Sequence, residues 1–329
     1  MSDSHKQAAP QEQPPVQAGP TSKEDFGFGN KIGPQTKRLV NPDGSYNIRR
    51  VGGGFGSIHP YQLLIGLPWW QFMLVILGGY LLFNAFFALL YLWAGVEGLN
   101  GAPENLESAW DRFKLAFFFS AQTFTTVGYG SLSPNSLSIN MIATFEAMTG
   151  LMGFALATGL LYGRFSQPSA KIGFSDQALI APYQEDLNGF MFRIVNRRKN
   201  ILLDLEVQVA VMWYVPQGEG FKQEYHFLKL ERRSVTVFPL TWTIVHPIES
   251  DSPLLGLSAE LLEARRAEFL IMLKGFDDTF GQHVHARRSY KFHEVVWGAK
   301  FTPAFHPDEE GHMVLELDRV SDWEKAALR

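Results

Sequence analysis

Two long apolar runs dominate the hydropathy pattern of this 329-residue chain. The first extends from Trp69 to Gly95 and contains no Asp, Glu, Lys, Arg or His. The second extends from Leu137 to Gly163, with Glu146 as its only charged residue. A helix of about 20 apolar residues spans a bilayer. The pattern therefore predicts two membrane-spanning helices, at about 69–95 and 137–163.

Residues at the ends of the first run support this prediction. Pro68 suits the first turn of a helix, where its missing N–H is not needed. Aromatic residues at both ends, Trp69 and Trp70 and then Tyr91 and Trp93, fit interfacial belts. The alternative, a buried helix of a soluble protein, is disfavoured by the length of the run and its lack of charge.

A shorter apolar stretch, AFFFSAQTFTTVGYG at 116–130, lies between the two runs. It is too short to cross a bilayer and suits a re-entrant segment, with a helix predicted at about 109–124. Irregular backbone at membrane depth is tolerated only where protein or water covers it. We therefore expect residues 68–168 to form one membrane domain.

The segments outside this domain differ in character. Residues 1–56 are rich in Gln, Pro, Ser, Gly and Lys and are predicted to be a disordered tail without a signal peptide. Residues 57–67 are predicted to form an amphipathic helix at the membrane interface. From residue 169 to residue 329, apolar and polar positions alternate between turn residues, which predicts a β-sandwich. Within it, Ser258–Arg266 is expected to be helical, and the C-terminal SDWEKAALR helical or frayed.

Charges set the expected orientation. Basic residues flank both runs, whereas the loop after the first run is acidic, so both termini of this multi-pass protein are predicted to be cytoplasmic. The basic residues are Arg49, Arg50, Arg164 and Lys171, and the acidic ones are Glu97, Glu104, Glu107 and Asp111.

Composition excludes several function classes. A net charge of -4 argues against nucleic-acid binding, and the absence of Cys excludes thiolate metal sites and Cys nucleophiles. No phosphate-binding, dinucleotide-binding or nucleophile-elbow motif is present, so neither enzymatic activity nor an organic cofactor is expected. His283, His285 and His293 lack a carboxylate or Cys framework, so they are not expected to form a metal site.

The segment between the runs ends in Thr126-Val127-Gly128-Tyr129-Gly130. This pentapeptide is identical to the known selectivity filter of potassium channels. In that filter, backbone carbonyls of four chains replace the hydration water of K⁺. Its glycines tolerate backbone angles that help successive carbonyls point the same way. Four copies are needed to ring an ion, so a homotetramer is expected.

Beyond this motif, the chain resembles inward-rectifier potassium channels of the bacterial type. The matching stretches include AFFFSAQTFTTVGYG, ALATGLLYGRFSQP, MFRIVNRRKNILLDLEVQVAVMW, WTIVHPIESDSPLLGL, HARRSY and HEVVWGAKF, in one order over about residues 57–305. The resemblance implies two spans, a re-entrant pore helix with a filter, a cytoplasmic immunoglobulin-like β-sandwich and a tetrameric pore. In such a tetramer the four β-sandwiches form a ring, and its movement is hypothesised to open or close the pore through residues 57–67.

The second run supplies candidate pore-lining residues. Phe154, Thr158 and Tyr162 are spaced i, i+4, i+8 and share one helical face. The resemblance places Tyr162 at a hydrophobic gate; an interfacial anchor is the alternative. It places Phe154 where strongly rectifying relatives carry an acid, so weak block by magnesium and polyamines is expected, with barium as the general blocking cation.

Four further residues are candidates for supporting the pore. Gly150 and Gly153 match a hinge, although small residues also simply let membrane helices pack closely. Glu146 is an ionisable residue within a span and is predicted to form hydrogen bonds behind the filter. Gln122 stands where relatives often carry a carboxylate, and is assigned to the same filter support.

By resemblance, the β-sandwich contributes a second part of the pore. Asp204 matches an acidic position facing that pore, and Phe276–Gln282 matches a constricting loop, with Phe276 and Gly281 as the named candidates. Anionic lipids are expected to contact Arg49, Arg50, Arg164 and Lys171, with inhibition by phosphoinositides the expected sign.

Two rival functions remain open at this stage. The pore subunit of a potassium uptake system normally carries several degenerate filters in one chain, whereas this chain has a single complete one. A two-span receptor or sensor would use the β-sandwich to bind a ligand without conducting ions. An ion-flux measurement separates the sensor from the channel.

Overall fold

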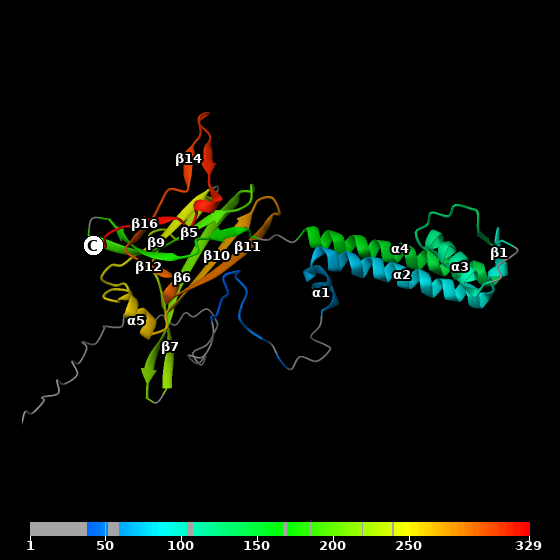
Figure 1. Ribbon diagram of the computed structural model, residues 1–329, viewed down its shortest axis with the longest axis horizontal. Coiled ribbons are helices and arrows are strands. Elements are labelled where there is room, and N and C mark those ends of the chain that lie inside the picture. Colours follow the sequence, from blue (N-terminus) through cyan, green and yellow to red (C-terminus); the bar gives the residue numbers. More distant parts are fainter. Residues whose placement is uncertain are drawn as a thin grey trace, which may run out of the picture. The chain divides into compact units, whose positions relative to one another are not determined.

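The structure is a computed structural model that describes residues 38–49, 51, 59–103, 108–166, 170–184, 186–218, 220–238 and 240–329. Most of the predicted tail 1–56 and the first two residues of the predicted interfacial helix lie outside these ranges. The chain forms two compact units (Figure 1). One comprises Arg50–Gln167, and the other Met1–Arg49 together with Pro168–Arg329.

The first unit is helical. Its helices are α1 (Pro60–Gly66), α2 (Trp69–Ala94), α3 (Ala109–Phe124) and α4 (Leu137–Phe165). At 1.5 Å per residue, α2 and α4 extend for about 39 and 44 Å, and both are long and apolar enough to cross a membrane. The short helix α3 packs against both, and a 3-10 turn η2 (Val96–Gly98) and a two-strand pairing of β1 (Leu99–Asn100) with β2 (Ser133–Pro134) complete the unit.

Local sequence explains where these helices begin and how closely they pack. The Ser108 hydroxyl accepts the N–H of Trp110 at the start of α3, and the Ser136 hydroxyl caps α4 in the same way. At Gly150 of α4, a Cβ would lie 2.1 Å from the carbonyl oxygen of Phe124. Only glycine lets α4 approach the end of α3 this closely.

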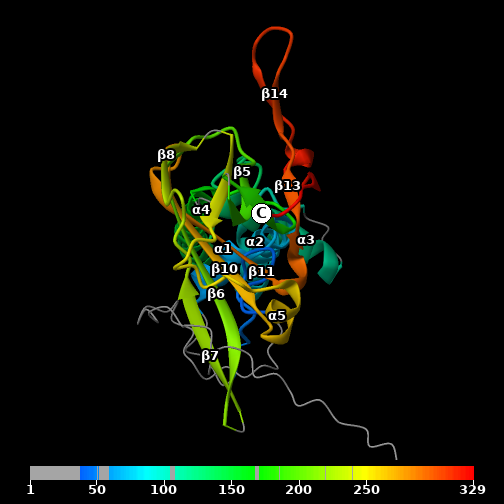
Figure 2. The same ribbon diagram turned by 90° about the vertical axis from the view of Figure 1, so that its left-hand side faces the viewer.

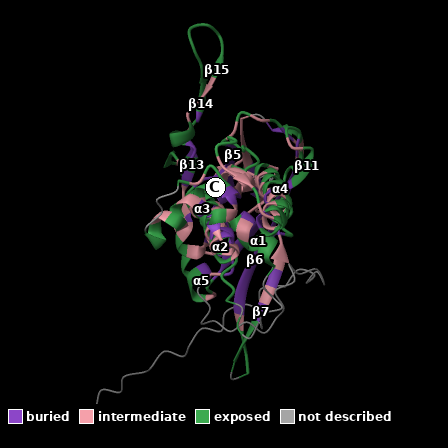
Figure 3. Cartoon of the chain, turned by 90° about the vertical axis from the view of Figure 1, so that its right-hand side faces the viewer, coloured by how far each residue is buried: buried purple, intermediate pink, exposed green. Residues whose placement is uncertain are grey.

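Many apolar side chains of the helical unit are exposed in the single chain (Figure 3). Large apolar side chains such as Leu82 and Met141 are 70% and 66% exposed in the single chain. Exposed apolar area on this scale marks surfaces that contact lipid or other protein.

The second unit is a β-sandwich of two five-stranded sheets (Figure 2). One sheet has the order β11-β10-β6-β7, with β8 also pairing with β6. Its strands are β6 (Leu202–Gln217), β7 (Gly220–Phe227), β8 (Ser234–Phe238), β10 (Glu268–Asp277) and β11 (Gln282–Lys291). The other has the order β12-β4-β5-β3, with β9 on β5, and comprises β3 (Ile172–Phe174), β4 (Ala178–Tyr183), β5 (Leu187–Asn196), β9 (Thr241–Pro247) and β12 (Val295–Trp297).

The inward positions of both sheets form one apolar core. Alternate residues of β6, from Leu205 to Trp213, are buried in it, and Phe190 of β5 stacks on Phe269 of β10 with ring centroids 4.2 Å apart. The period-two alternation of the sequence thus produced the predicted sandwich.

Of the two short helices that the sequence predicts in this unit, the structure contains one. Helix α5 (Ala259–Ala264) lies within the predicted helical stretch and is capped by Ser258. The prediction for the C-terminal SDWEKAALR is wrong. After η3 (Phe292–Glu294), β13 (Ala299–Phe301) pairs with β16 (Trp323–Lys325), so the C-terminal segment is extended because a strand edge is available to it. Between them lie a hairpin of β14 (Phe305–Pro307) and β15 (Met313–Leu315), and the turn η4 (Leu317–Arg319).

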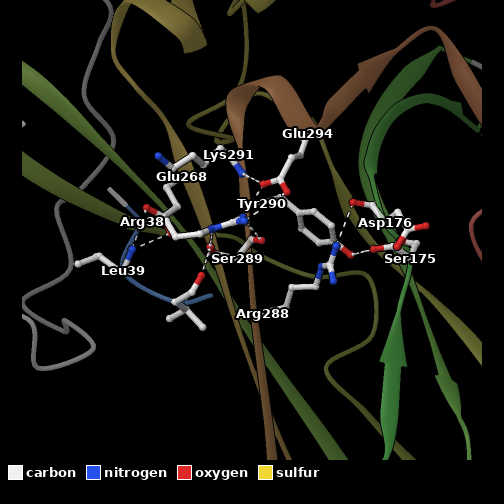
Figure 4. A network of polar contacts seen from close by, with 11 residues as sticks. Arg38, Leu39, Ser175, Asp176, Glu268, Arg288, Ser289, Tyr290, Lys291 and Glu294 are labelled. Atoms are coloured by element: carbon white, nitrogen blue, oxygen red, sulfur yellow. Dashed lines mark hydrogen bonds and ion pairs between the residues drawn. The ribbon is translucent and has the colours of Figure 1, made fainter. Parts of the chain in front are cut away.

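Residues 38–47 also depart from the expectation of a disordered tail. Leu39 and Val40 are buried against the sheet of β6, β7 and β10. The Glu268 carboxylate accepts the N–H of Leu39 at 3.1 Å, and Arg38 pairs with Glu294 at 2.5 Å (Figure 4). Predicted disorder therefore does not extend to this segment, because apolar and charged partners far along the chain hold it.

Candidate functional site

The segment that follows α3 has an alternating backbone. Thr126, Gly128 and Gly130 have φ of 60°, 50° and 81°, whereas Val127 and Tyr129 between them are not left-handed. Alternation of right- and left-handed residues turns successive peptide groups the same way, with N–H groups on one side and carbonyls on the other. We therefore expect the carbonyl oxygens of residues 126–130 to form a short aligned row.

The end of α3 holds the N–H side of this row. The Gln122 carbonyl accepts N–H groups from Val127 at 2.9 Å and Gly128 at 3.3 Å, and the Thr123 carbonyl accepts that of Thr126 at 3.1 Å. Among the described residues, no hydrogen bond ends on a carbonyl oxygen of residues 126–130. The carbonyls remain available to a cation, and the negative end of the α3 dipole lies beside them.

Glu146 forms the centre of a buried polar cluster that joins three helices. It is fully buried and accepts hydrogen bonds from the Tyr91 hydroxyl of α2 at 2.5 Å and from the Ser120 hydroxyl of α3. Asn84 extends the cluster, since its carbonyl oxygen lies 3.1 Å from the Ser120 hydroxyl. Gln122, whose backbone carbonyl accepts the N–H groups of Val127 and Gly128, lies two residues beyond Ser120 on the same helix.

Sequence reasoning found Glu146 but missed its partners. Tyr91 was assigned to an interfacial belt, and this is wrong, because its side chain is fully buried and bonded to the carboxylate. The available signal was the presence of isolated polar residues, Asn84 and Ser120, within otherwise apolar runs.

The predicted pore-lining residues of α4 share one exposed face. Phe154 and Tyr162 are each 73% exposed in the single chain, and Thr158 between them is exposed as well. Helix α4 continues unbroken past Gly150 and Gly153, which both face Phe124 at the end of α3. This geometry favours close packing over bending as the explanation of the two glycines in this conformation.

Arg164 is engaged by protein groups. Its guanidinium donates to the carbonyls of Leu64, Ile65 and Leu67, where α1 ends and the chain turns into α2. It also lies over the Trp69 ring, 4.5 Å from the centroid. Of the other predicted lipid contacts, Arg49 and Lys171 are exposed, and Arg50 lies outside the described residues.

Replacing Arg164 with alanine is expected to release α1 from α4. The variant loses hydrogen bonds to carbonyls that a helix end leaves unpaired. This loss should reduce the stability of the α1–α4 contact by about 1–3 kcal/mol. Amide hydrogen exchange over 59–67 should rise, and Arg164→Lys should rescue poorly because an ammonium lacks the guanidinium fork. Lys171→Ala is the matched control; equal exchange in both variants and the unchanged protein would refute this role.

In the β-sandwich, Asp204 lies at a bulge of β6. Strand β10 passes from Lys274 to Phe276 while β6 passes from Glu206 to Leu203, so β6 carries one extra residue. Asp204 adopts a φ of 46° there and is exposed. The residue opposite is Gly275, whose added Cβ would lie 2.9 Å from Leu205.

The loop at the end of β10 is a tight turn. Gly281 has a φ of 61° and donates its N–H to the Asp277 carbonyl at 2.8 Å. Phe276 is half-buried and meets the His283 ring edge-on at 5.6 Å. Among the described residues, no group of His, Cys, Asp or Glu is arranged to hold a metal ion.

Two apolar helices that flank a re-entrant helix and a row of unbonded carbonyls, joined to a β-sandwich, define an ion channel. Carbonyl oxygens offer a dehydrated cation ligands that carry no full charge.

Comparison with known proteins identifies the family. Residues 172–327 match the family described as "Inward rectifier potassium channel C-terminal domain", and residues 75–167 the family described as "Ion channel". The chain is 36% identical over 298 residues to the inward rectifier potassium channel Kirbac3.1 of Paramagnetospirillum magnetotacticum, covering 89% of this chain and 98% of that one.

Two mouse proteins are more distant. Inward rectifier potassium channel 4 of Mus musculus is 27% identical, over 76% of this chain and 63% of its own length, and G protein-activated inward rectifier potassium channel 3 of Mus musculus is 28% identical, over 81% and 72%. A solved structure of the sporulation control protein Spo0M from Bacillus subtilis covers 42% of this chain and 59% of its own, at 10% identity and a TM-score of 0.22, too low to indicate a shared fold.

The chain belongs to the inward-rectifier potassium channel family, and it is a membrane protein that functions as a potassium channel. The predicted fold class, two spans followed by a β-sandwich, is confirmed.

Proposed function

We propose that four copies of this chain form the pore and that K⁺ is dehydrated by the carbonyls of residues 126–130. The alternating backbone with unbonded carbonyls carries this proposal. The exposure of Val127 and Tyr129, 53% and 77% in the single chain, supports the assembly. Neighbouring copies would cover these side chains while the carbonyls of four chains surround the ion.

Conduction is proposed to be controlled at two constrictions. Tyr162 projects from the same exposed face as Phe154, so four tyrosine rings can narrow the pore at the end of α4. The loop from Phe276 to Gln282, with Gly281 at its turn, is the second constriction. Because Phe154 carries no charge, block by magnesium and polyamines should be weak, whereas barium should block at the filter.

Anionic lipids are proposed to modulate the channel, with phosphoinositides as inhibitors. Exposed basic side chains near the ends of the spans attract such headgroups, and Lys171 and Arg49 are of this kind. Arg50 remains a candidate by sequence alone. Arg164 is a weaker candidate than its position suggested, because protein carbonyls occupy its guanidinium. Both termini are proposed to be cytoplasmic, in a cell inner membrane.

The rival functions have less support. A ligand-binding sensor would not need an aligned carbonyl row held by Gln122, and an uptake subunit would normally carry several filters. Among the described residues we identify no catalytic constellation, and we propose no enzymatic activity and no cofactor besides K⁺ in the filter.

Rubidium-86 uptake into liposomes that contain the purified tetramer tests the channel. We expect barium-sensitive uptake that favours K⁺ and Rb⁺ over Na⁺ and falls as a phosphoinositide is added to the vesicles. Tyr162→Ala should raise uptake, because it removes the hydrophobic constriction. If both forms of the tetramer were silent in every lipid, the sensor would replace the channel as the preferred function.

A further inference from the structure

Asp277 stands out as a fully buried carboxylate at the base of the loop from Phe276 to Gln282. A buried charge is unfavourable unless hydrogen bonds compensate it. The compensation here comes from two separate segments, and the loop is one of them.

Within the loop, one oxygen of the carboxylate holds the backbone. Asp277 Oδ1 accepts the N–H groups of Thr279 at 3.0 Å and Phe280 at 3.3 Å. The Asp277 carbonyl accepts the N–H of Gly281 at 2.8 Å, which closes the turn. A single residue thus orders three consecutive amides of the loop.

The other carboxylate oxygen of Asp277 accepts a hydrogen bond from outside the loop. Asp277 Oδ2 accepts the side-chain N–H of Asn200 at 2.7 Å, and Asn200 lies 77 residues earlier, in the turn between β5 and β6. That turn is itself tied down, since Asn196 at the end of β5 donates to the Asn200 carbonyl at 2.6 Å. Arg198 of the same turn lies over the Phe280 ring, 5.8 Å from its centroid.

We propose that Asp277 and Asn200 form a latch that sets the position of the Phe276–Gln282 loop and couples it to the turn of residues 197–201. The inference rests on the proposed role of this loop as a constriction. Movement of the loop away from the turn strands a buried carboxylate oxygen, so the two segments move together. Asp277 acts as a positioning residue and does not itself contact the permeating ion.

The two side chains allow a charge-swap test. Asn200→Asp places a second carboxylate of nearly the same shape against Asp277, so repulsion replaces attraction. In the double variant Asn200→Asp with Asp277→Asn, the amide introduced at position 277 still accepts the loop N–H groups through its oxygen. Its NH₂ donates to the carboxylate introduced at position 200, so every bond of the latch is restored with reversed polarity.

Amide hydrogen exchange of the full-length tetramer in nanodiscs reports the latch directly. Loss of a hydrogen bond to a charged group should raise exchange of residues 279–281 roughly 10- to 100-fold in Asn200→Asp. The swap should return exchange close to that of the unchanged protein. Asp318→Asn is the control, because Asp318 is exposed and lies outside the loop.

Rubidium uptake by the same proteins separates the latch from the gate. We expect uptake to rise in Asn200→Asp and to return in the swap. Unchanged exchange in Asn200→Asp, or a swap that fails to restore it, overturns the latch and leaves the proposed gate untouched. Exchange that rises and is restored while uptake stays constant supports the latch and removes the gating role of the loop.

Discussion

Replacing Gly128 with alanine is expected to abolish potassium flux. Gly128 has a φ of 50°, and an added Cβ would meet no atom within 4 Å in the single chain, so the effect arises from backbone strain alone. A left-handed conformation costs a residue with a side chain roughly 1–2 kcal/mol. In a tetramer the cost applies four times, about 4–8 kcal/mol, which lowers the population of the conducting filter by on the order of 10³- to 10⁶-fold.

Rubidium uptake by the reconstituted Gly128→Ala tetramer measures this effect. Gly159→Ala is the matched control, because Gly159 lies in α4 with open space around it and no left-handed φ. The control should conduct as the unchanged protein does. Normal selective uptake by the Gly128→Ala tetramer would show that the carbonyl row of residues 126–130 is not the site of dehydration.

Removing the Glu146 carboxylate is expected to destabilise the pore unit. In Glu146→Ala, the Tyr91 hydroxyl loses its carboxylate acceptor, whereas the Ser120 hydroxyl keeps the Asn84 oxygen. An unsatisfied buried polar group costs about 1–3 kcal/mol, so the free energy of unfolding should fall by about that amount per chain. Ser120 lies on α3, and the Gln122 carbonyl of the same helix accepts N–H groups of residues 127 and 128. Potassium flux should therefore fall together with stability.

Thermal unfolding of the tetramer and rubidium uptake should be measured together. Glu146→Gln keeps one acceptor oxygen and should lie between alanine and the unchanged protein. Thr144→Ala, on the same helix, removes an exposed hydroxyl that bonds only within α4 and should have little effect. If Glu146→Ala unfolded at the same temperature as Thr144→Ala, the buried cluster would not be a source of stability.

The elements of the fold were predictable because they depend on neighbours close in sequence. An uncharged run from Trp69 to Gly95 has few alternatives to a span, and period-two alternation in β6 has few alternatives to a strand. The candidate filter was identified by its motif, and two of its three left-handed positions, Gly128 and Gly130, are glycines. These features need no knowledge of the rest of the chain.

The partners of polar residues were not predictable from such patterns. Glu146 was expected to form hydrogen bonds, yet Tyr91 lies 55 residues away and was assigned to a lipid interface. Arg164 was expected to contact lipid headgroups, and its hydrogen bonds to the end of α1, nearly 100 residues earlier, were not foreseen. A charge next to a span has the same appearance in sequence whichever partner it has.

The sequence by itself thus determined two spans, a filter between them, a β-rich remainder and membership of a potassium channel family. Only the tertiary structure decided that residues 38–47 pack on the sandwich, that β16 pairs with β13, and that Asp277 is bonded to Asn200. The physical reason is that hydrophobic periodicity is a local property, repeated every few residues. Hydrogen-bond partners and strand edges are instead chosen by packing between segments that are distant along the chain.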